Sequence, residues 1–344
     1  LPMGRYWLEV SARNFQVHRS TVELAAPDAP PARIVLTLAG FQSDVTVTSE
    51  PGQGLGLNGT PAGGRATLRL NQMSNAYSGH YPISGHYPIE PRMGEIERLR
   101  IQAEVMAFDT GAMLDRFGPM QGWSCLDIGC GPGGITDLLS VRAGPTGRVV
   151  GLDMNETFLE YARKNAPSNV EFRLADAYRT DLPSGSFHLV HMRFVASTAG
   201  DFGNLLKEAM RLARPGGIVA LQESDGSTLN CYPPHPAWDR LKTAFLAAFR
   251  GAGADLELGR RLYFLVQGAG LHDVQYRAAL PAIRSIDPMV DYLPSTVESL
   301  RATILRLGLL NESDLTAALT DCRRHLATPG TAFTMPTMAQ VWGR

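Results

Sequence analysis

Glycines and acids spaced along residues 126–177 suit the binding of a nucleoside-like ligand. Residues 126–134 read LDIGCGPGG, in which a short apolar run ends at Asp127 and turns through four glycines into an apolar segment. Glycine lets a ligand approach bare peptide N–H groups and tolerates the positive φ of tight turns. We therefore expect the loop at Gly129 and Gly131 to hold a small ligand against its backbone.

Acids also follow the next two expected strands. Residues 148–152 form an apolar run that ends in Asp153, about twenty residues beyond the loop, where a carboxylate can accept hydrogen bonds from both ribose hydroxyls. A third run, VEFRLAD, delivers Asp176 and the backbone N–H of Ala177, which suit the edge of an adenine. The spacing thus favours an adenosine ligand.

Strands and helices must alternate to position these residues. The runs SFHLVHMRFV and IVALQE read as two further strands, separated by the helical pattern FGNLLKEAMRLA and the turn RPGG. Five β/α units are expected between residues 124 and 225, which predicts a parallel sheet with helices on both faces.

The segments DIGCGPGG, GLDMN, LADAYRTDLP, FHLVHMRF and RPGGIVALQE occur in one family in this order. The chain resembles the class I S-adenosylmethionine (SAM) dependent methyltransferases of the small-molecule branch, over about residues 87–342 and most specifically over 120–225. The resemblance implies an α/β fold with a Rossmann-like, seven-stranded, doubly wound sheet. Strands near HDVQYRAAL and AFTMPTMAQVW, one of them antiparallel, would close that sheet.

The resemblance also implies individual cofactor contacts. Gly129 and Gly131 would approach the methionine part of SAM, and Asp127 would orient its amino group directly or through water. The other implied contacts are Asp153 with the ribose, Met154, Asp176 and Ala177 with the adenine, and Arg193 at the end of the fourth strand.

An N-terminal segment covers the SAM pocket in related methyltransferases, where a tyrosine often precedes a helix carrying RLxxQ. The expected helix here is GEIERLRIQAEVMAFDTGAMLDRF, with RLRIQ ending at Gln102. Tyr87 and Gln102 are therefore expected cofactor contacts, although Gln102 would face the surface in the alternative interpretation. Tyr87 belongs to a repeated SGHYPI at residues 78–83 and 84–89, which forms either a flap over the cofactor or a local loop duplication.

Methyl transfer depends more on alignment of the nucleophile with the methyl group than on acid–base chemistry. The sulfonium already makes the methyl group electrophilic, so the enzyme must orient a nucleophile and exclude water. A general base is needed only for some acceptors. His191 is the first candidate and Glu223 the second. In the alternative interpretation His191 is hydrogen-bonded within its strand, and Arg193 pairs with an acid such as Glu223.

The acceptor is expected to bind outside the cofactor core. Residues 287–326 predict two helices, the second beginning at Asn311 or Ser313. With residues 76–117 they would form a helical lid above the carboxyl ends of the strands, where open α/β folds bind ligands. Such a lid suits a small, partly apolar molecule, and a homodimer contact is the competing use of the same apolar faces.

Composition agrees with a cytoplasmic enzyme. The 344 residues are 44% hydrophobic with a formal net charge of −1, the basic residues are scattered, and there is no run of eighteen apolar residues. These features predict neither a nucleic-acid nor a membrane partner. The four cysteines form no CxxC pair and are expected to be small buried residues, so no metal site is predicted.

Residues 1–72 differ from the rest because apolar and polar residues alternate there as in strands. They resemble part of a carboxypeptidase-regulatory-like β-sandwich through GRYWLEVSARNF and DVTVTSEP. We expect a short β-rich extension or remnant, with the methyltransferase domain over residues 73–344. The alternative is an accessory strand pair packed on the catalytic domain.

The sequence therefore predicts methyl transfer from S-adenosyl-L-methionine to a small organic acceptor, on oxygen or nitrogen with carbon as a further option, releasing S-adenosyl-L-homocysteine. An oxidoreductase using NAD or FAD is the alternative within the same architecture, but no second glycine fingerprint is present. A non-catalytic SAM-binding module is the alternative from another class.

Overall fold

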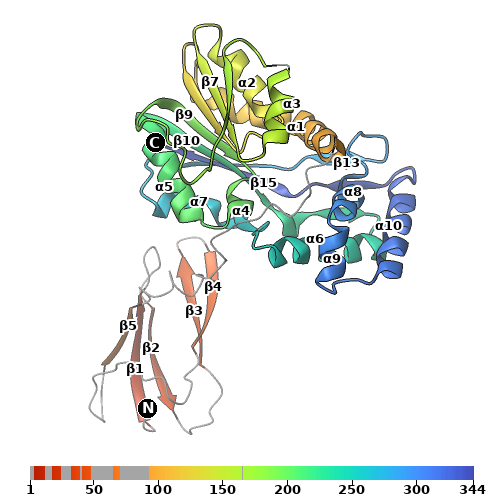
Figure 1. Ribbon diagram of the computed structural model, residues 1–344. Coiled ribbons are helices and arrows are strands. Elements are labelled where there is room, and N and C mark those ends of the chain that lie inside the picture. The colour runs from red at the N-terminus through yellow and green to blue at the C-terminus, as the bar shows by residue number, and fades with distance from the viewer. Residues whose placement is uncertain are drawn as a thin grey trace. The chain divides into compact units, whose positions relative to one another are not determined.

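The computed structural model describes the backbone of residues 93–164 and 166–344 throughout (Figure 1). Of the residues before these, it describes 4–11, 18–24, 32–38, 41–47 and 65–69, all of them as strands. The chain forms two compact units, residues 1–80 and 81–344. In the first unit, β1 (Gly4–Ser11) pairs antiparallel with β2 (His18–Leu24) and parallel with β5 (Arg65–Arg69), while β3 (Ala32–Leu38) pairs antiparallel with β4 (Phe41–Val47). The resemblance to a β-sandwich and the domain boundary at residue 73 stay predictions.

The second unit is built on a seven-stranded sheet with the order β12-β15-β10-β9-β6-β7-β8. Its strands are β6 (Ser124–Ile128), β7 (Arg148–Asp153), β8 (Val170–Leu174), β9 (Phe187–Arg193), β10 (Ala213–Asp225), β12 (Gln275–Ala279) and β15 (Thr337–Gly343). Strand β15 runs antiparallel to both of its neighbours, and β6 to β10 pair in parallel. The predicted doubly wound sheet and its antiparallel closing strand are confirmed.

Helices cover both faces of the sheet because its central strands are apolar on both sides. On one face lie α1 (Met93–Leu114), the 3₁₀ turn η1 (Asp115–Phe117) and α2 (Gly134–Ala143), and they enclose a core that includes Met113 and Leu139. The opposite face carries α4 (Ala196–Ala199), α5 (Phe202–Leu212), η3 (Leu258–Arg261) and α7 (Leu262–Gly268). Helix α3 (Glu156–Lys164) packs on β7 and β8.

A separate helical lid has its own core, distinct from the two cores against the sheet. Trp238, Phe245, Leu293 and Phe333 are among its buried members. The lid helices lie together in Figure 1. They are α6 (Pro236–Gly251), α8 (Tyr292–Ser299), α9 (Arg301–Arg306) and α10 (Glu312–Leu326). A small sheet of β11 (Asn230–Tyr232), β14 (Ala332–Thr334) and β13 (Ala282–Arg284) completes the lid, and η2 (Gly226–Thr228) leads into it.

The prediction of two helices over residues 287–326 was wrong, because the first is divided into α8 and α9 at Leu300. Leu300 leaves helical geometry, with φ −97° and ψ 2°, and is fully buried in the lid core. The bend lets both short helices pack apolar faces inward. The predicted start of the last helix is confirmed at Asn311, whose side chain accepts a hydrogen bond from the Asp314 N–H at 2.8 Å.

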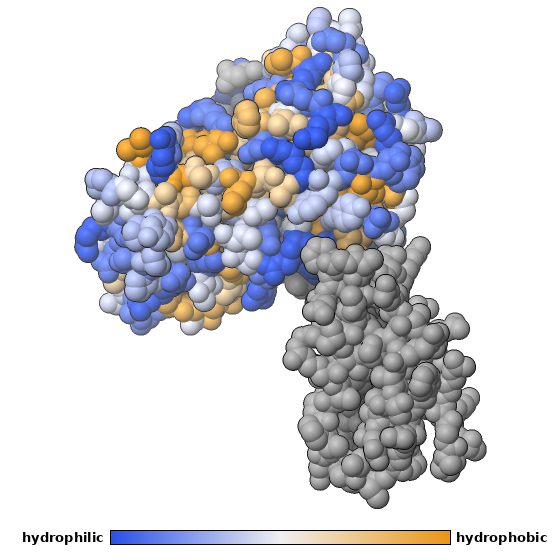
Figure 2. All heavy atoms as spheres, turned by 180° about the vertical axis from the view of Figure 1, so that it is seen from behind, coloured by the Kyte–Doolittle hydropathy of each residue, from blue (hydrophilic) through white to orange (hydrophobic). Residues whose placement is uncertain are grey.

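The surface seen in Figure 2 is a mixture of hydrophilic and hydrophobic residues. Within the part of the chain that the structure describes, no helix has both the length and the apolar composition needed to span a membrane.

Candidate functional site

The glycine loop joins β6 to α2 and is held by close packing. Gly129 has φ 67°, and a Cβ built on it would lie 2.3 Å from Val195 Cγ2, so an alanine would not fit there. Gly131 has φ 53°, and a Cβ there would meet nothing within 4 Å. Gly129 is thus required by the protein's own packing, whereas Gly131 borders open space that a ligand can use.

Asp153, at the carboxyl end of β7, ties this loop to the next one. One carboxylate oxygen accepts a hydrogen bond from the Gly131 N–H at 2.8 Å, and the other accepts from the Asn155 N–H at 2.9 Å. Burial raises the pKa of Asp153, while the backbone donors oppose that rise. Each carboxylate oxygen has two lone pairs, so the carboxylate keeps acceptor capacity for the two hydroxyls of a ribose.

The predicted adenine contacts lie at the ends of β7 and β8. Met154 follows Asp153 directly and is 77% exposed, so its side chain offers apolar surface beside the loop. Asp176 follows β8, is exposed, and accepts a hydrogen bond from the Tyr178 N–H at 2.9 Å, with Ala177 half-buried between them. Since β7 and β8 are neighbours in the sheet, these residues lie at the same edge of the sheet.

Asp127 and His191 meet within the sheet, on the paired strands β6 and β9. Asp127 Oδ1 lies 2.8 Å from His191 Nδ1, and His191 Nε2 lies 2.7 Å from the side-chain nitrogen of Gln222. Both ring nitrogens of His191 therefore have polar partners, and the side chain is 0% exposed. Asp127 Oδ2, in contrast, is buried and has no hydrogen-bond partner among the residues that the structure describes.

Arg193 follows His191 by two residues and is the last residue of β9. Its guanidinium donates to the Thr110 hydroxyl at 3.4 Å, and burial lowers its pKa to about 10. Its guanidinium carbon lies 5.9 Å from the centre of the Phe194 ring. The structure gives no ion pair between Arg193 and Glu223, although both belong to its described part, because the Glu223 carboxylate is engaged elsewhere.

Glu223 is fully buried at the end of β10. Its two oxygens accept hydrogen bonds from the backbone N–H groups of Ala196 and Ser197, at 2.8 and 3.2 Å. Burial raises the pKa of Glu223 to about 7, and these backbone donors act against the rise. The carboxylate therefore holds the first turn of α4 in place, next to the end of β9.

A cavity opens where the lid meets the carboxyl ends of β9 and β10. Its volume is about 70 Å³, and it is partly open to solvent. The lining is mostly apolar with a few hydroxyls and one charged side chain. Its residues are Arg98, Gln102, Met106, Phe194, Ser197, Thr198, Ser224, Gly226, Phe245, Phe249, Leu256, Tyr292, Thr296 and Pro336.

Gln102 belongs to this cavity and not to the surface. It is 8% exposed and accepts a hydrogen bond from Arg98 at 2.8 Å, so the interpretation as a surface-facing glutamine was wrong. Its contact with a cofactor stays a prediction. Tyr87, together with the repeated SGHYPI segment, lies outside the described residues.

Sequence reasoning missed most of the cavity lining. Phe245 and Phe249 come from α6, and Tyr292 and Thr296 come from α8. The available signal was aromatic residues four apart on an amphipathic helix, but such spacing is typical of ordinary core residues too. Tyr232, His235 and Trp238, the aromatic residues before and at the start of α6, do not line the cavity. Trp238 is a core residue of the lid instead.

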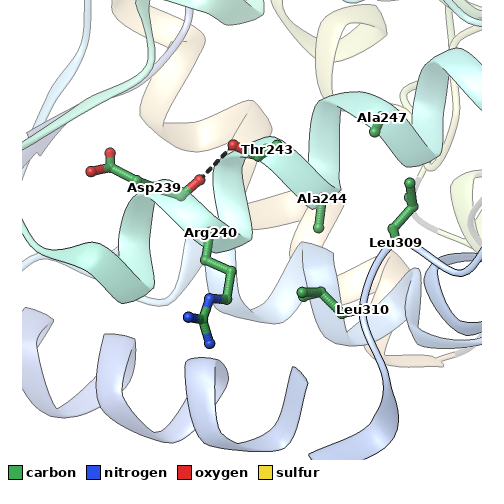
Figure 3. Close-up of a pocket in the computed structure, with 7 residues that line it drawn as sticks. All are labelled: Asp239, Arg240, Thr243, Ala244, Ala247, Leu309 and Leu310. Carbon is green, nitrogen blue, oxygen red and sulfur yellow. Dashed lines mark hydrogen bonds between the residues drawn. The ribbon is translucent and has the colours of Figure 1, made fainter. Parts of the chain in front are cut away.

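A second hollow lies against α6 of the lid (Figure 3). It is formed by one side of α6 and the chain before α10, with Asp239, Arg240, Leu309 and Leu310 around it. Thr243 donates to the Asp239 carbonyl across one helical turn at 2.8 Å. No residue of the glycine loop or of the strand ends lines this hollow, so we do not assign chemistry to it.

The cysteines are free and buried, as expected. Burial raises the pKa of each thiol, to about 12 for Cys125 and about 11 for Cys231. Across the described part of the chain, no cluster of three or more His, Cys, Asp or Glu side chains is arranged to hold a metal ion.

Comparison with known proteins now adds to this geometry. Residues 126–221, from the second half of β6 to the middle of β10, match the family described as methyltransferase domain. The chain is 37% identical over 123 residues to a demethylmenaquinone methyltransferase of Lactococcus lactis subsp. lactis, and this match covers 35% of this chain and 49% of that one. It is also 37% identical over 125 residues to an uncharacterized 37.1 kDa protein in transposon TN4556 of Streptomyces fradiae, with 35% and 36% covered.

The chain thus spans about half or less of the length of these curated relatives. A putative methyltransferase of Bacillus halodurans C-125 is similar in structure, with a TM-score of 0.45 at 16% identity over 67% of this chain and 96% of that one. The matched segment contains the glycine loop, Asp153 and Asp176. Residues 126–221 thus match a methyltransferase domain, and the sheet that contains them has the Rossmann-like, doubly wound strand order.

Proposed function

We propose that this protein transfers a methyl group from SAM to a small organic acceptor and releases S-adenosyl-L-homocysteine. The observation that carries the proposal is that one short segment, residues 194–197, contacts both the glycine loop and the lid cavity. Val195 packs against Gly129, while its neighbours Phe194 and Ser197 line the cavity. A ligand on the loop would therefore present its reactive end to the cavity.

The residues around the loop fit SAM. Asp127 Oδ2 is a buried acceptor without a partner among the described residues, which suits an ammonium group. The space beside Gly131 is free, so an amino-acid chain can lie against its peptide. The Asp153 carboxylate is placed for a ribose, and the exposed Met154 offers an apolar surface for a purine.

The chemistry that SAM supplies is a methyl group already activated by the sulfonium. What the chain itself must do is orient the acceptor and exclude water, and a well-oriented reaction gains roughly 7 to 11 kcal/mol in this way. We propose that His191 orients Asp127 and does not remove a proton, because its ring nitrogens are both engaged. Glu223 would likewise fix α4 beside the cavity.

The cavity lining supports a small acceptor with an apolar body and at least one polar group. Phe194, Phe245 and Phe249 offer apolar surface, while Ser224 and Thr296 offer hydroxyls. The similarity to a demethylmenaquinone methyltransferase supports an organic acceptor of this general kind. Phe245 is the acceptor-side position that we would substitute first, because it lines the cavity without belonging to the cofactor loop.

Calorimetric titration of the full chain with SAM, S-adenosyl-L-homocysteine and NADH tests the cofactor. Micromolar binding of the first two, lost in Asp153→Ala, supports the proposal, and binding of NADH alone overturns it in favour of redox chemistry. Incubation with methyl-labelled SAM and a panel of phenols, amines and carboxylic acids tests transfer. Binding of SAM without labelled product from any acceptor would favour a non-catalytic SAM-binding module.

A further inference from the structure

A single chain of hydrogen bonds crosses the sheet from the cofactor loop to its far edge. Five neighbouring strands, β6, β9, β10, β15 and β12, each contribute one polar side chain. Those side chains are Asp127, His191, Gln222, Gln340 and Arg277. The first four are at most 1% exposed, and such buried polar side chains are retained only when they are paired.

Arg277 fixes the direction of donation along this row of hydrogen bonds, because a guanidinium can only donate. It donates to Gln340 Oε1 at 2.5 Å and to Asp109 Oδ1 at 2.6 Å. The Gln340 amide nitrogen must then point the other way, and it donates to Gln222 Oε1 at 2.7 Å.

The same oxygen of Gln222 also accepts from the Thr110 hydroxyl at 3.1 Å. Its amide nitrogen is thereby turned toward His191 Nε2, at 2.7 Å. An amide N–H can only donate, so Nε2 must offer a lone pair and the ring proton must lie on Nδ1. His191 therefore donates from Nδ1 to Asp127 Oδ1.

The consequence reaches the glycine loop. A donor at Oδ1 fixes the rotation of the Asp127 carboxyl, and Oδ2 is left as a buried acceptor without a described partner. A buried carboxyl oxygen without a partner selects a hydrogen-bond donor, and a cationic donor forms the stronger bond. A primary ammonium of an amino acid has that chemistry.

Resting on the proposed function, we propose that Gln222, Gln340 and Arg277 are positioning residues for the amino-acid end of the cofactor, acting through His191 and Asp127. None of the three would touch the cofactor. Their effect on binding would depend on whether the ligand carries an ammonium group. A purely structural role would affect every adenosine ligand alike.

The test compares two ligands and three variants of the full chain. S-adenosyl-L-homocysteine carries the ammonium, whereas 5′-methylthioadenosine lacks the amino-acid end. Gln222→Met removes both hydrogen-bonding ends of the amide at nearly constant volume. Arg277→Met acts at the end of the hydrogen-bond network. The Arg277 side chain is 22% exposed there, so its loss is less of a risk to folding. Gln267→Met, on an exposed position of α7, is the matched control.

We expect Gln222→Met to weaken binding of S-adenosyl-L-homocysteine at least tenfold and to leave 5′-methylthioadenosine within twofold. Arg277→Met should act in the same direction with a smaller loss, and Gln267→Met should change neither. An equal effect on both ligands, or no effect of either network variant, overturns the inference. Failure of the unsubstituted chain to bind either ligand would instead overturn the proposed function.

Discussion

Replacing Gly131 by alanine separates cofactor binding from protein stability, because the chain contains a matched control. Gly131 and Gly216 have similar backbone conformations, φ 53° and φ 70°, and a Cβ at either position meets nothing within 4 Å. Each substitution forces an alanine into the left-handed region, which costs about 1 to 2 kcal/mol. Only Gly131 lies in the glycine loop.

The effect on binding follows from the N–H of Gly131 and the space beside it. That N–H donates to Asp153 at 2.8 Å, and the added methyl group would project into the space that we assign to the cofactor. If the methyl group keeps the cofactor away from the loop, the cofactor loses at least one hydrogen bond to a charged group of the site. Such a bond contributes about 1.5 to 3 kcal/mol to the free energy of binding. This predicts roughly a ten- to hundredfold weaker Kd for SAM.

Urea unfolding and calorimetric titration, applied to both variants, measure the two effects separately. Gly131→Ala and Gly216→Ala should lose similar unfolding free energy, whereas only Gly131→Ala should lose affinity for SAM. Unchanged affinity in Gly131→Ala would refute the assignment of the open space to the cofactor. Equal loss in Gly216→Ala would show that backbone strain alone weakens binding.

Three further predictions concern burial. The pKa of Glu223 is about 7 in the folded protein against a usual 4.5, so between these pH values the folded protein keeps a proton that the unfolded chain has lost. The stabilisation from this proton is full below pH 4.5, and the free energy of unfolding falls by about 3 kcal/mol as the pH rises to 7. Urea unfolding from pH 4.5 to 8 should show this fall in the wild type and not in Glu223→Gln, and parallel curves would contradict it. Gly134→Ala would place a Cβ 2.4 Å from the Ala103 Cβ, so we expect a loss of about 1 to 3 kcal/mol that Ala103→Gly partly restores in the double variant, again measured by urea unfolding. All four cysteines are buried, so Ellman's reagent should label none in the native protein and four after denaturation; rapid labelling of a native thiol would count against the packing.

The alternation of strands and helices and the position of the glycine loop could be predicted because both depend on local patterns. Alternating strands and helices fix a doubly wound sheet, and Gly129, Gly131 and Asp153 occupy strand ends that meet at one edge. The break at Leu300 could not be predicted in the same way, since it depends on how α8 and α9 pack on α6.

His191 shows the limit of prediction more clearly. As a histidine near the end of a strand it suggested a base, and the alternative of a hydrogen-bonded strand residue was left open. The partners that occupy its ring come from positions 64 residues before it and 31 residues after it. No local pattern reports such contacts, so the geometry within the sheet was needed to see that its lone pair is occupied.

The order of elements along the chain places the predicted cofactor contacts before most of the lid. The predicted contacts of the loop and of β7, β8 and β9 all precede residue 225, whereas the lid is built from residues 230–251 and 282–334. Recombination after Asp225 would exchange the lid helices and their share of the cavity lining, while the lining residues from α1, from the end of β9 and from β10 would stay. Because the pair Gln222 and Gln340 spans that junction, productive chimaeras should be those whose incoming segment supplies a compatible amide on the strand that pairs with β10.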